Sequence, residues 1–484
     1  MLEPCSCLVA LSGRVVRWGA VAALLLLGVC AQAQEKPYNV LFLMSDDLNT
    51  NISPYGDPIA KTPNMDKLFD QGVRFDRAYC SATTCIPSRT AILTGQRPQT
   101  TGVYGPKPEE NIFYTKRFPD LVTLPMLFKD NGYRVIQIGK ISDTRNDDPA
   151  MWSESYKKNL RFHENYNELP TKNGAEIQKR VDENSWFYAY WAEVEVDNEE
   201  LLGDGAMANE ACEMIKELAK SPDKPFFLGV GFKSPHVDFS APQAYYDLYR
   251  DVDFDFKHDY DNKIKPRQDW YIGYENLFDN TDAFISSEFR PGALRAYYAC
   301  TSFVDAQVGK VLQALEEAGL AENTIIVFAG DHGFLVGGHA HFGKSSFFEP
   351  VWRTPMAMVV PGVTQPGSST EGMIEFVDIY PTLAELCDLK APDSVEGRSF
   401  VPLLKQPDQA WKDAVFSVNN AGMEFVRTDR WKLVLTPKGK PMALFDELND
   451  PDEETNLVND PQYKALVASL KARIDELHPE PKKS

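Results

Sequence analysis

The segment Cys85-Ile86-Pro87-Ser88-Arg89 combines a cysteine with an arginine four residues later. In a helix, this spacing places both side chains on one face. Gly95 suits the end of such a helix and Pro87 is tolerated only in its first turn, so we expect Cys85 at the helix N-terminus. Free N–H groups and the helix dipole favour an anion there, and the Arg89 guanidinium suits a tetrahedral oxyanion. These five residues are equally consistent with a capped surface helix that carries a buried structural cysteine.

Four short apolar runs that have the pattern of buried strands each lead to charged or titratable residues. Ligands of open α/β sheets bind beyond the carboxyl ends of the strands, so we expect these polar groups to converge on one crevice. The runs and groups are residues 38–44 before Asp46 and Asp47, 133–138 before Lys140, 225–230 before His236, and 324–329 before Asp331 and His332.

Strand and helix patterns alternate along most of the chain, which is typical of an α/β fold with a large, mainly parallel sheet sandwiched by helices. We expect helices at residues 63–71, 121–131, 302–318 and 379–389. After about residue 410 the pattern favours a small antiparallel sheet and a terminal helix. We therefore expect a catalytic domain over 35–410 and a C-terminal α+β subdomain over 411–484. Residues 251–282 are expected to form a long surface excursion.

The amino terminus has the features of a secretory signal over residues 1–33. Arg14 and Arg17 precede an apolar run, and Ala31-Gln32-Ala33 fits a small-residue cleavage site. The run is too short to span a bilayer, and no later segment is apolar enough to do so. We expect an exported protein, periplasmic or secreted, with no membrane span. A lipoprotein anchor at Cys30 is the alternative, although the preceding Val29 is bulkier than such processing favours.

The charge and cysteine content limit the classes of partner and fold. A formal net charge of −20 argues against nucleic acid as a partner. An anionic substrate must then be met by a local basic pocket, because the overall field repels it. The wide, irregular spacing of the cysteines after residue 33 favours buried thiols over a disulfide framework. These cysteines are Cys80, Cys85, Cys212, Cys300 and Cys387.

Three aspartates at two of the strand ends have the chemistry of a metal site. Asp46 and Asp47, with Asp331, supply the hard carboxylate oxygens that calcium or magnesium prefers. An Asp-Asp pair on its own is more often a helix cap or turn, but Asp331 at a second strand end favours a metal. His332 is an unusual ligand for a hard cation.

The C-x-P-S-R run, followed by Thr94-Gly95, resembles the signature of the type I sulfatases, and Asp331-His332 resembles the Asp-His pair of the iduronate-2-sulfatase-like branch. The resemblance implies an alkaline-phosphatase-like fold and the oxidation of Cys85 to formylglycine by a sulfatase-maturing enzyme. It also implies one calcium ion held by Asp46, Asp47, Asp331, His332 and the oxidised Cys85. Further matches are Pro235-His236, the stretch from Asp331 through His339 to Lys344, and the C-terminal segments 427–433 and 444–451.

The resemblance also assigns roles to the basic residues. In this family, the residues that match Lys140, His236 and Lys344 hold the sulfate oxygens and assist the leaving alkoxide, and the match of Arg89 steadies the hydrated formylglycine. The function implied is hydrolysis of sulfuric esters on a sulfated carbohydrate. Two alternatives are a phosphonate or phosphate ester hydrolase of the same superfold, and a non-catalytic protein that binds sulfated glycans and keeps Cys85 unmodified.

Three positions depart from the iduronate-2-sulfatase-like pattern, and all belong to the expected pocket wall. Asp143 stands where the branch places a histidine, Ser234 where a basic residue is usual, and Gly338 where an acidic residue is common. An acid at position 143 repels a carboxylate next to the reacting sulfate. We therefore expect a neutral sulfated sugar, or one whose hydroxyl groups bond to Asp143, in preference to a 2-sulfated uronic acid, unless Arg145 or Lys233 neutralises this charge.

Overall fold

The computed structural model describes residues 36–105, 114–143, 145, 147–156, 169–172, 191–254, 289–340 and 342–477. The expected signal segment and most of the expected excursion at 251–282 lie outside these residues. The elements that follow all belong to the unit Tyr38–Ser484. Among the described residues, no helix combines the length and the apolar character needed to cross a bilayer.

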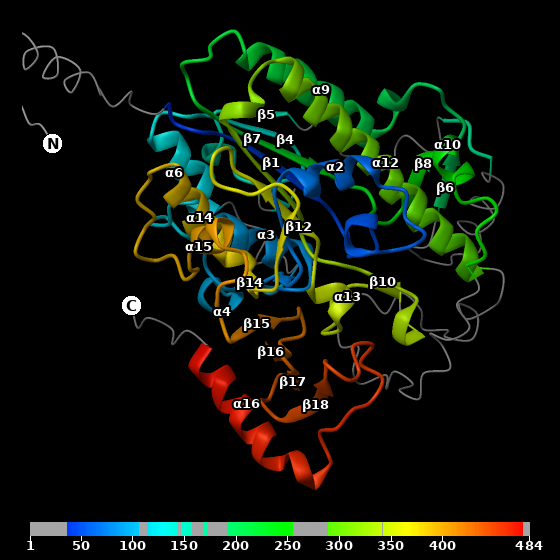
Figure 1. Ribbon diagram of the computed structural model, residues 1–484, viewed down its shortest axis with the longest axis vertical. Helices are drawn as coiled ribbons and strands as arrows, with labels where there is room; N and C mark the ends of the chain where they lie inside the picture. Colours follow the sequence, from blue (N-terminus) through cyan, green and yellow to red (C-terminus); the bar gives the residue numbers. More distant parts are fainter. Residues whose placement is uncertain are drawn as a thin grey trace, which may run out of the picture. The chain divides into compact units, whose positions relative to one another are not determined.

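An eight-stranded, mostly parallel sheet forms the centre of this unit (Figure 1). Only the two pairs made by the strand Met356–Val359 are antiparallel. In order across the sheet, the strands are β13 (Ser368–Thr370), β2 (Val73–Phe75), β12 (Met356–Val359), β9 (Thr324–Gly330), β1 (Asn39–Ser45), β7 (Phe226–Phe232), β4 (Arg134–Gly139) and β5 (Glu154–Tyr156). The four strands expected from the sequence are the adjacent, parallel set β9-β1-β7-β4, so their carboxyl ends lie along one stretch of the sheet edge.

Helices cover both faces of this sheet, which confirms the expected α/β class (Figure 1). Side chains of β1 alternate between the faces: Val40 and Phe42 enter one core, whereas Leu41 and Leu43 enter the other. The first core also contains residues of α3 (Cys85–Thr94), α6 (Leu124–Asp130) and α14 (Ile379–Leu386), and the second contains residues of α2 (Pro63–Gln71), α9 (Gly203–Leu218) and α12 (Phe289–Glu317).

Three of the four helices expected in this region have different bounds from those predicted. Helix α6 begins later because Thr123 caps it, accepting a bond from the Met126 N–H, with Pro125 in the first turn. Helix α14 ends at Leu386, before residue 389. Helix α12 begins at Phe289 instead of 302. The apolar stripe that predicts 302–318 faces the sheet, whereas the earlier turns pack through Tyr297 in a separate aromatic core.

Short elements complete the main part of the fold. Three two-stranded pairs are β3 (Ala78–Tyr79) with β14 (Ile374–Glu375), β6 (Trp191–Val194) with β8 (Phe239–Pro242), and β10 (Leu335–Val336) with β11 (Phe342–Gly343). The short helices are α4 (Pro98–Thr101), α5 (Tyr114–Arg117), α10 (Gln243–Asp247), α13 (Glu349–Trp352) and α15 (Val401–Lys405). The five cysteines of the described residues are free thiols, all buried except the half-buried Cys212.

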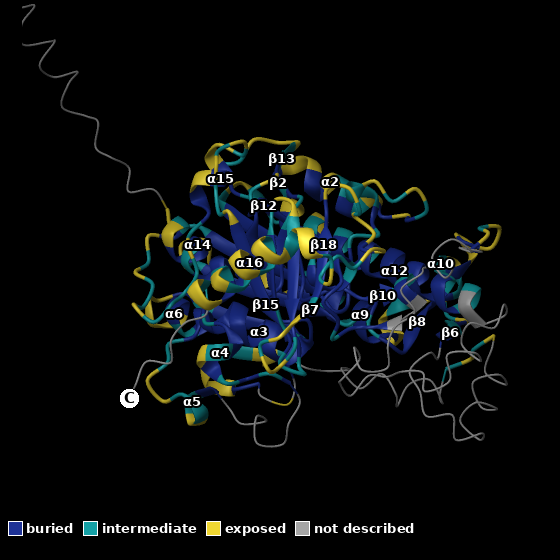
Figure 2. Ribbon diagram, turned by 90° about the horizontal axis from the view of Figure 1, so that it is seen from below, coloured by how far each residue is buried: buried dark blue, intermediate teal, exposed yellow. Residues whose placement is uncertain are grey.

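The C-terminal residues form the expected small antiparallel sheet with a helix. Its strands are β15 (Ala414–Val418), β16 (Glu424–Thr428), β17 (Trp431–Leu435) and β18 (Pro441–Asp446), followed by α16 (Lys464–Leu477). One face of the sheet packs on α16 through residues such as Leu433, while the opposite face contributes Phe425 to the central core. Helix α3 is buried along its whole length, whereas α16 exposes its outer side (Figure 2).

A buried cluster of charges joins this small sheet to the rest of the unit. Lys432 of β17 is fully buried, and its ammonium group contacts the carboxylates of Glu453, Glu447 at 3.3 Å and Glu349 at 3.5 Å. Burial opposes the charge of Lys432, but these carboxylates raise its pKa above the usual value. Because Glu349 begins α13, soon after Lys344 in the chain, the cluster fixes the segment that carries an expected site residue.

We predict that Lys432→Met lowers the free energy of unfolding by about 3–5 kcal/mol, because three buried carboxylates lose their shared cation. Urea denaturation of the whole chain measures this. Lys471→Met is the matched control. Lys471 lies on α16 and its ammonium group donates only to the Gly439 carbonyl among the contacts of the described residues. We expect its loss to change the free energy of unfolding by no more than about 0.5 kcal/mol. Equal stability of Lys432→Met and the parent would show that the cluster does not hold the sheet in place.

Candidate active site

The helix that carries the C-x-P-S-R run has the predicted bounds. Thr84 is extended at the N-cap, Cys85 is the first helical residue, and Pro87 lies in the first turn. The helix ends at Gly95, which has a φ of +66° and donates its N–H to the Ala91 carbonyl. Cys85 therefore lies at a helix N-terminus, at the edge of the sheet where β1 and β9 end.

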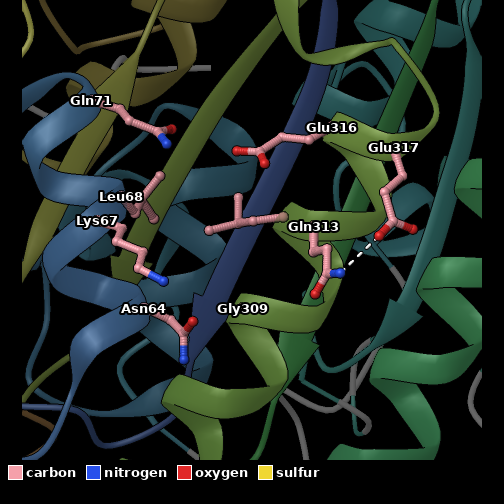
Figure 3. Close-up of a pocket in the computed structure, with 9 residues that line it drawn as sticks. Asn64, Lys67, Leu68, Gln71, Gly309, Gln313, Glu316 and Glu317 are labelled. Atoms are coloured by element: carbon pink, nitrogen blue, oxygen red, sulfur yellow. Dashed lines mark hydrogen bonds between the residues drawn. The ribbon is translucent and has the colours of Figure 1, made fainter.

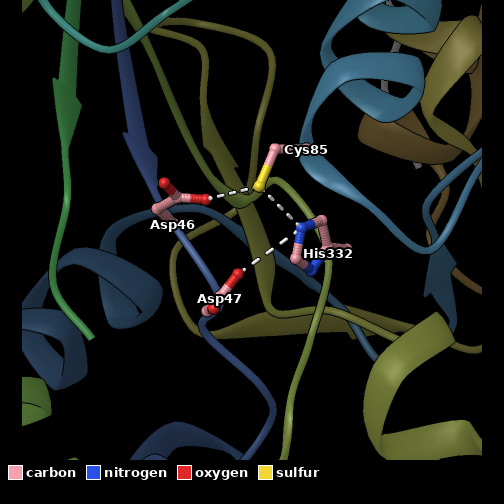
Figure 4. Close-up of side chains that lie close together, drawn as sticks. All are labelled: Asp46, Asp47, Cys85 and His332. Carbon is pink, nitrogen blue, oxygen red and sulfur yellow. Dashed lines mark hydrogen bonds and ion pairs between the residues drawn. The ribbon is translucent and has the colours of Figure 1, made fainter. Parts of the chain in front are cut away.

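Four of the expected site residues form a buried group in which each offers an atom within 4.8 Å of the others: Asp46, Asp47, Cys85 and His332 (Figure 4). The two aspartates follow β1 and the histidine follows β9. Cys85 Sγ lies 3.3 Å from Asp46 Oδ1 and 3.2 Å from His332 Nε2. The structure thus brings together residues that are as far apart in the chain as Asp46 and His332.

Arg89 ties the helix to both of these strand ends. It is fully buried, and its Nε donates to Asp331 Oδ2 at 2.9 Å while Nη2 lies 3.5 Å from Asp46 Oδ1. Its Nη1 also donates to the Ile141 carbonyl, beyond the end of β4. One guanidinium group therefore holds the segments after β1, β4 and β9 around the start of α3.

Two lysines and a histidine line the same group. Lys140 Nζ lies 2.5 Å from Asp46 Oδ2, and Lys344 Nζ lies 2.9 Å from Asp47 Oδ1 and 3.2 Å from Cys85 Sγ. His236 Nε2 lies 3.9 Å from Asp47 Oδ2. Every basic residue expected at the site is therefore beside the carboxylates and the cysteine.

Asp331 occupies a different position from the other expected metal ligands. It lies beside the four-residue group, with Oδ2 3.6 Å from His332 Nε2. Its Oδ1 accepts bonds from the backbone N–H groups of Asp47 and His332, and its Oδ2 accepts the bond from Arg89. In this structure, Asp331 orients the loops after β1 and β9.

The electrostatics of the site disfavour a reactive thiolate. A helix N-terminus favours an anion, but burial and then the Asp46 carboxylate raise the pKa of the Cys85 thiol well above its usual value. An unmodified Cys85 is therefore a neutral thiol at neutral pH and a poor nucleophile. The anion that we expected at this helix end must be carried by a group other than the thiol.

The donor set fits a hard cation. Asp47 Oδ2 is buried and has no hydrogen-bond partner among the residues that the structure describes. Burial raises the pKa of Asp47 to about 6, although Lys344 and His332 oppose this shift. Carboxylate oxygens of Asp46 and Asp47 are the atoms that calcium prefers. The charges of the three aspartates (46, 47 and 331) are balanced by Arg89, Lys140 and Lys344, so a bound divalent cation would give the site the local positive charge that an anionic substrate needs.

Two cations surround the carboxylate of Asp143. Asp143 Oδ1 accepts a bond from Arg145 Nε at 2.8 Å, its Oδ2 accepts one from Arg145 Nη2 at 3.2 Å, and Lys140 Nζ lies 3.4 Å from Oδ2. Burial opposes ionisation, but Lys140 and Arg145 outweigh it and hold the pKa of Asp143 well below its usual value. Arg145 thus offsets the negative charge of Asp143, which is one of the exceptions that the sequence analysis allowed, so this charge alone does not favour a neutral sugar.

Several residues that support the site were not found from the sequence. Asp204, in the first turn of α9, accepts bonds from the N–H groups of Lys233 and Ser234 at 2.8 Å and so fixes the loop that leads to His236. The Tyr297 hydroxyl group donates to the Asp47 carbonyl and accepts from the Asn49 N–H. In the sequence, Asp204 is recognisable only as an acid in the first turn of a helix. Many acids occupy that position simply because they interact favourably with the helix dipole.

The C-terminal sheet also supports the segment that carries Cys85. Val418, at the end of β15, accepts a bond from the Thr83 N–H, and the Thr83 carbonyl accepts one from the Ser345 N–H. The Asn419 side chain donates to the Ser345 carbonyl at 3.1 Å. The segments just before Cys85 and just after Lys344 are therefore bonded to each other and to the C-terminal sheet.

A separate hollow of about 390 Å³ opens between α2 and α12 (Figure 3). Residues such as Lys67, Gln313 and Glu317 line it. None of the residues of the buried group contributes to this hollow, so it has no part in the site at the strand ends.

Comparisons with known proteins agree with this geometry. Residues 38–389 match the family described as Sulfatase, and residues 337–480 match the family described as N-sulphoglucosamine sulphohydrolase, C-terminal. A sulfatase of Formosa agariphila is 33% identical, over 93% of this chain and 91% of the relative. Iduronate 2-sulfatase of Mus musculus is 30% identical, over 73% of this chain and 69% of the relative.

A solved structure shares the fold. The phosphonate monoester hydrolase of Agrobacterium radiobacter superposes with a TM-score of 0.71 over 91% of this chain and 95% of its own, at 21% identity. This likeness concerns the fold, and it confirms the expected architecture of a large sheet between helices. The matched family covers residues 38–389, which is more than half of the chain, and with the relative from Formosa agariphila it shows that the chain belongs to the sulfatase family.

Proposed function

We propose that this sulfatase removes sulfate from a sulfated carbohydrate, with formylglycine at position 85 as the nucleophile and one calcium ion beside it. The observation that carries the proposal is the position of Cys85: it begins a buried helix and contacts Asp46, His332 and Lys344. The mouse relative, whose name states that it acts on iduronate 2-sulfate, supports a sulfated sugar as the substrate class.

A sulfatase-maturing enzyme is part of the proposal. Conversion of Cys85 is a two-electron oxidation in which the side chain loses its sulfur and gains a carbonyl oxygen, so it needs an external oxidant that such an enzyme supplies. All residues of α3 are buried in the folded chain, so the conversion must precede folding. Residues 1–33, which lie outside the described residues, support export of the protein to the periplasm or beyond the cell.

The proposed calcium site uses the carboxylates of Asp46, Asp47 and Asp331, with His332 and the modified residue 85. Asp331 is included because its Oδ2 lies close to His332. The same oxygen accepts a bond from Arg89, which would compete with binding of the ion. The ion would stabilise negative charge on the nucleophile and on the sulfate oxygens. As a hydrated aldehyde, residue 85 would supply an oxygen nucleophile for the sulfur and a second hydroxyl group that allows sulfate to leave.

The chain's own basic residues handle the charges of the reaction. The ammonium groups of Lys140 and Lys344 flank the carboxylates and are placed to bind sulfate oxygens, where charge develops. His236 Nδ1 lies within hydrogen-bonding distance of the Val237 carbonyl and therefore carries a proton. Its Nε2, which faces the site, is then the atom that takes up a proton and delivers it to the leaving alkoxide. Burial, followed by Lys344, holds the pKa of His236 well below its usual value, so His236 would take up its proton from solvent when the anionic substrate binds.

Two other functions compete with this one. A phosphonate or phosphate ester hydrolase is favoured by the shared fold of the Agrobacterium radiobacter enzyme. A non-catalytic protein that binds sulfated glycans would keep Cys85 as a thiol. Turnover of an aryl sulfate, an aryl phosphate and a phenyl phosphonate ester by one preparation separates the three. We expect the highest kcat/KM on the aryl sulfate. Turnover of only the phosphate or phosphonate ester would contradict the proposal. So would the absence of any turnover by a protein that carries formylglycine at position 85.

We predict that an active preparation, made in a host with a sulfatase-maturing enzyme, carries formylglycine at position 85. Mass spectrometry of the tryptic peptide that ends at Arg89 measures this directly. Cys85→Ala should be inactive but folded, with a far-UV circular dichroism spectrum like that of the parent, because the change at a helix start removes few contacts. An active preparation whose peptide carries only the thiol would contradict the mechanism.

We also predict that calcium stabilises the chelator-treated protein and that Asp47→Asn abolishes this gain. A ligand at 100 times its dissociation constant adds about 2.7 kcal/mol to folding stability, which raises the melting temperature. The apo form of Asp47→Asn should be as stable as the parent, because the substitution removes a buried carboxylate with a raised pKa.

Asp413→Asn is the matched control for this test, since Asp413 is an exposed partner of Arg473. Its response to calcium should equal that of the parent. If Asp47→Asn bound as much calcium as the parent, by elemental analysis after gel filtration, the proposed ligand set would be wrong.

A further inference from the structure

A row of alternating charges leads from the nucleophile towards solvent. Cys85 contacts Asp46, Asp46 pairs with Lys140 at 2.5 Å, Lys140 lies 3.4 Å from Asp143, and Asp143 binds Arg145. The exposed fraction of the side chain is 0% for Asp46, 13% for Lys140, 3% for Asp143 and 44% for Arg145. Arg145 is thus the end of the row and its most exposed group.

The guanidinium group of Arg145 is held in a fixed orientation with one side unused. Its Nε and Nη2 donate to the two oxygens of Asp143. Within the part of the chain that the structure describes, Nη1 makes no hydrogen bond and no ion pair with a second carboxylate. A planar fork presented in this way suits another oxyanion.

Arg145 keeps its charge at the end of this row. Partial burial opposes the charge, but the bonds to Asp143 raise the pKa of Arg145, and the chain of contacts through Asp143, Lys140 and Asp46 connects its guanidinium group to Cys85. Asp143 is shared between Lys140 and Arg145, and Lys140 also pairs with Asp46, so the charges of the row cancel and Arg145 is its positive outer end. An anion beside the reacting sulfate would be attracted to this positive end.

We propose that Arg145, oriented by Asp143, binds a second oxyanion of the substrate next to the sulfate ester that is cleaved. The substrate class is then a sulfated sugar that carries a further anionic group, either a carboxylate or a second sulfate. This inference rests on the proposed sulfatase function and names the substrate class of the same site. We therefore expect an anionic sugar where the sequence alone suggested a neutral one. The reason is that Arg145 neutralises Asp143 and still offers Nη1 to an anion.

A purely structural role for Arg145 makes a different prediction. If Arg145 only held Asp143, and through it Lys140, its loss would lower turnover of every sulfate ester by the same factor. A residue that binds a second anion changes selectivity instead. The ratio of kcat/KM values for an anionic and a neutral substrate therefore separates the two roles.

The test uses two matched pairs of substrates and an aryl sulfate. The first pair is a 2-sulfated uronide and the same sugar with its carboxylate reduced to an alcohol. The second pair is glucosamine 2-N,6-O-disulfate and N-acetylglucosamine 6-sulfate. The pair that the parent hydrolyses identifies whether the second anion is a carboxylate or a sulfate, and we expect the parent to prefer the anionic member.

We expect Arg145→Gln to lower the anionic-to-neutral ratio of kcat/KM by roughly ten- to a hundredfold, the loss expected for a charge-assisted hydrogen bond. Arg145→Lys, which keeps the charge but not the fork, should lose less. Arg473→Gln is the matched control, because Arg473 lies on α16 and pairs with Asp413 and Glu476. The kcat/KM ratio of this variant should equal that of the parent.

Three results would overturn the inference: an unchanged ratio in Arg145→Gln, a parent that prefers the neutral members, or a parent that hydrolyses the aryl sulfate and neither anionic sugar. Absence of all sulfate ester turnover by a formylglycine-bearing parent would instead contradict the proposed function. In that case, calorimetric titration of Cys85→Ala with and without Arg145→Gln still decides the inference, because tighter binding of the anionic members must depend on Arg145.

Discussion

The site depends on one buried guanidinium group. Arg89 bridges Asp331 and Asp46, and it also bonds to the chain after β4. Without Arg89, two buried carboxylates at the start of α3 would lose a positive charge that offsets the cost of removing them from water. The helix that carries Cys85 and three strand ends are therefore held by the same charge. This explains why the C-x-P-S-R spacing matters: the arginine must lie one turn after the cysteine to reach the loops that surround it.

The second constraint comes from the C-terminal sheet. Val418 and Asn419 bond to the segments that carry Cys85 and Lys344, and Lys432 holds Glu349 of the same region through a buried ion cluster. Residues far from the sheet edge thus set the position of the groups that act there. The small sheet contributes one face to the central core, so its loss would expose apolar surface as well as release the site.

The positions of the four strands and of α3 could be predicted because each is a local pattern: an apolar run, a first-turn proline or a terminal glycine. The convergence of Asp46, Lys140, His236 and His332 followed from the parallel order of the strands. Partnerships between distant residues could not be predicted. Asp204 bonds to the N–H groups of Lys233 and Ser234, yet it has the same sequence signal as any capping acid. The local pairing of Asp143 with Arg145 was one of the possibilities open from the sequence, and the structure supplies its geometry. The early start of α12 was missed because its first turns pack in a different core from the later ones.

A double-mutant cycle on Arg89→Gln and Asp331→Asn tests the central role of the guanidinium most directly. We predict that Arg89→Gln alone lowers the free energy of unfolding by about 3–5 kcal/mol, because it leaves buried carboxylates unpaired. The double variant should be more stable than the sum of the single losses predicts, with a coupling energy of about 0.5–3 kcal/mol. Single losses that simply add would contradict the account, since Arg89 and Asp331 would then hold the site independently.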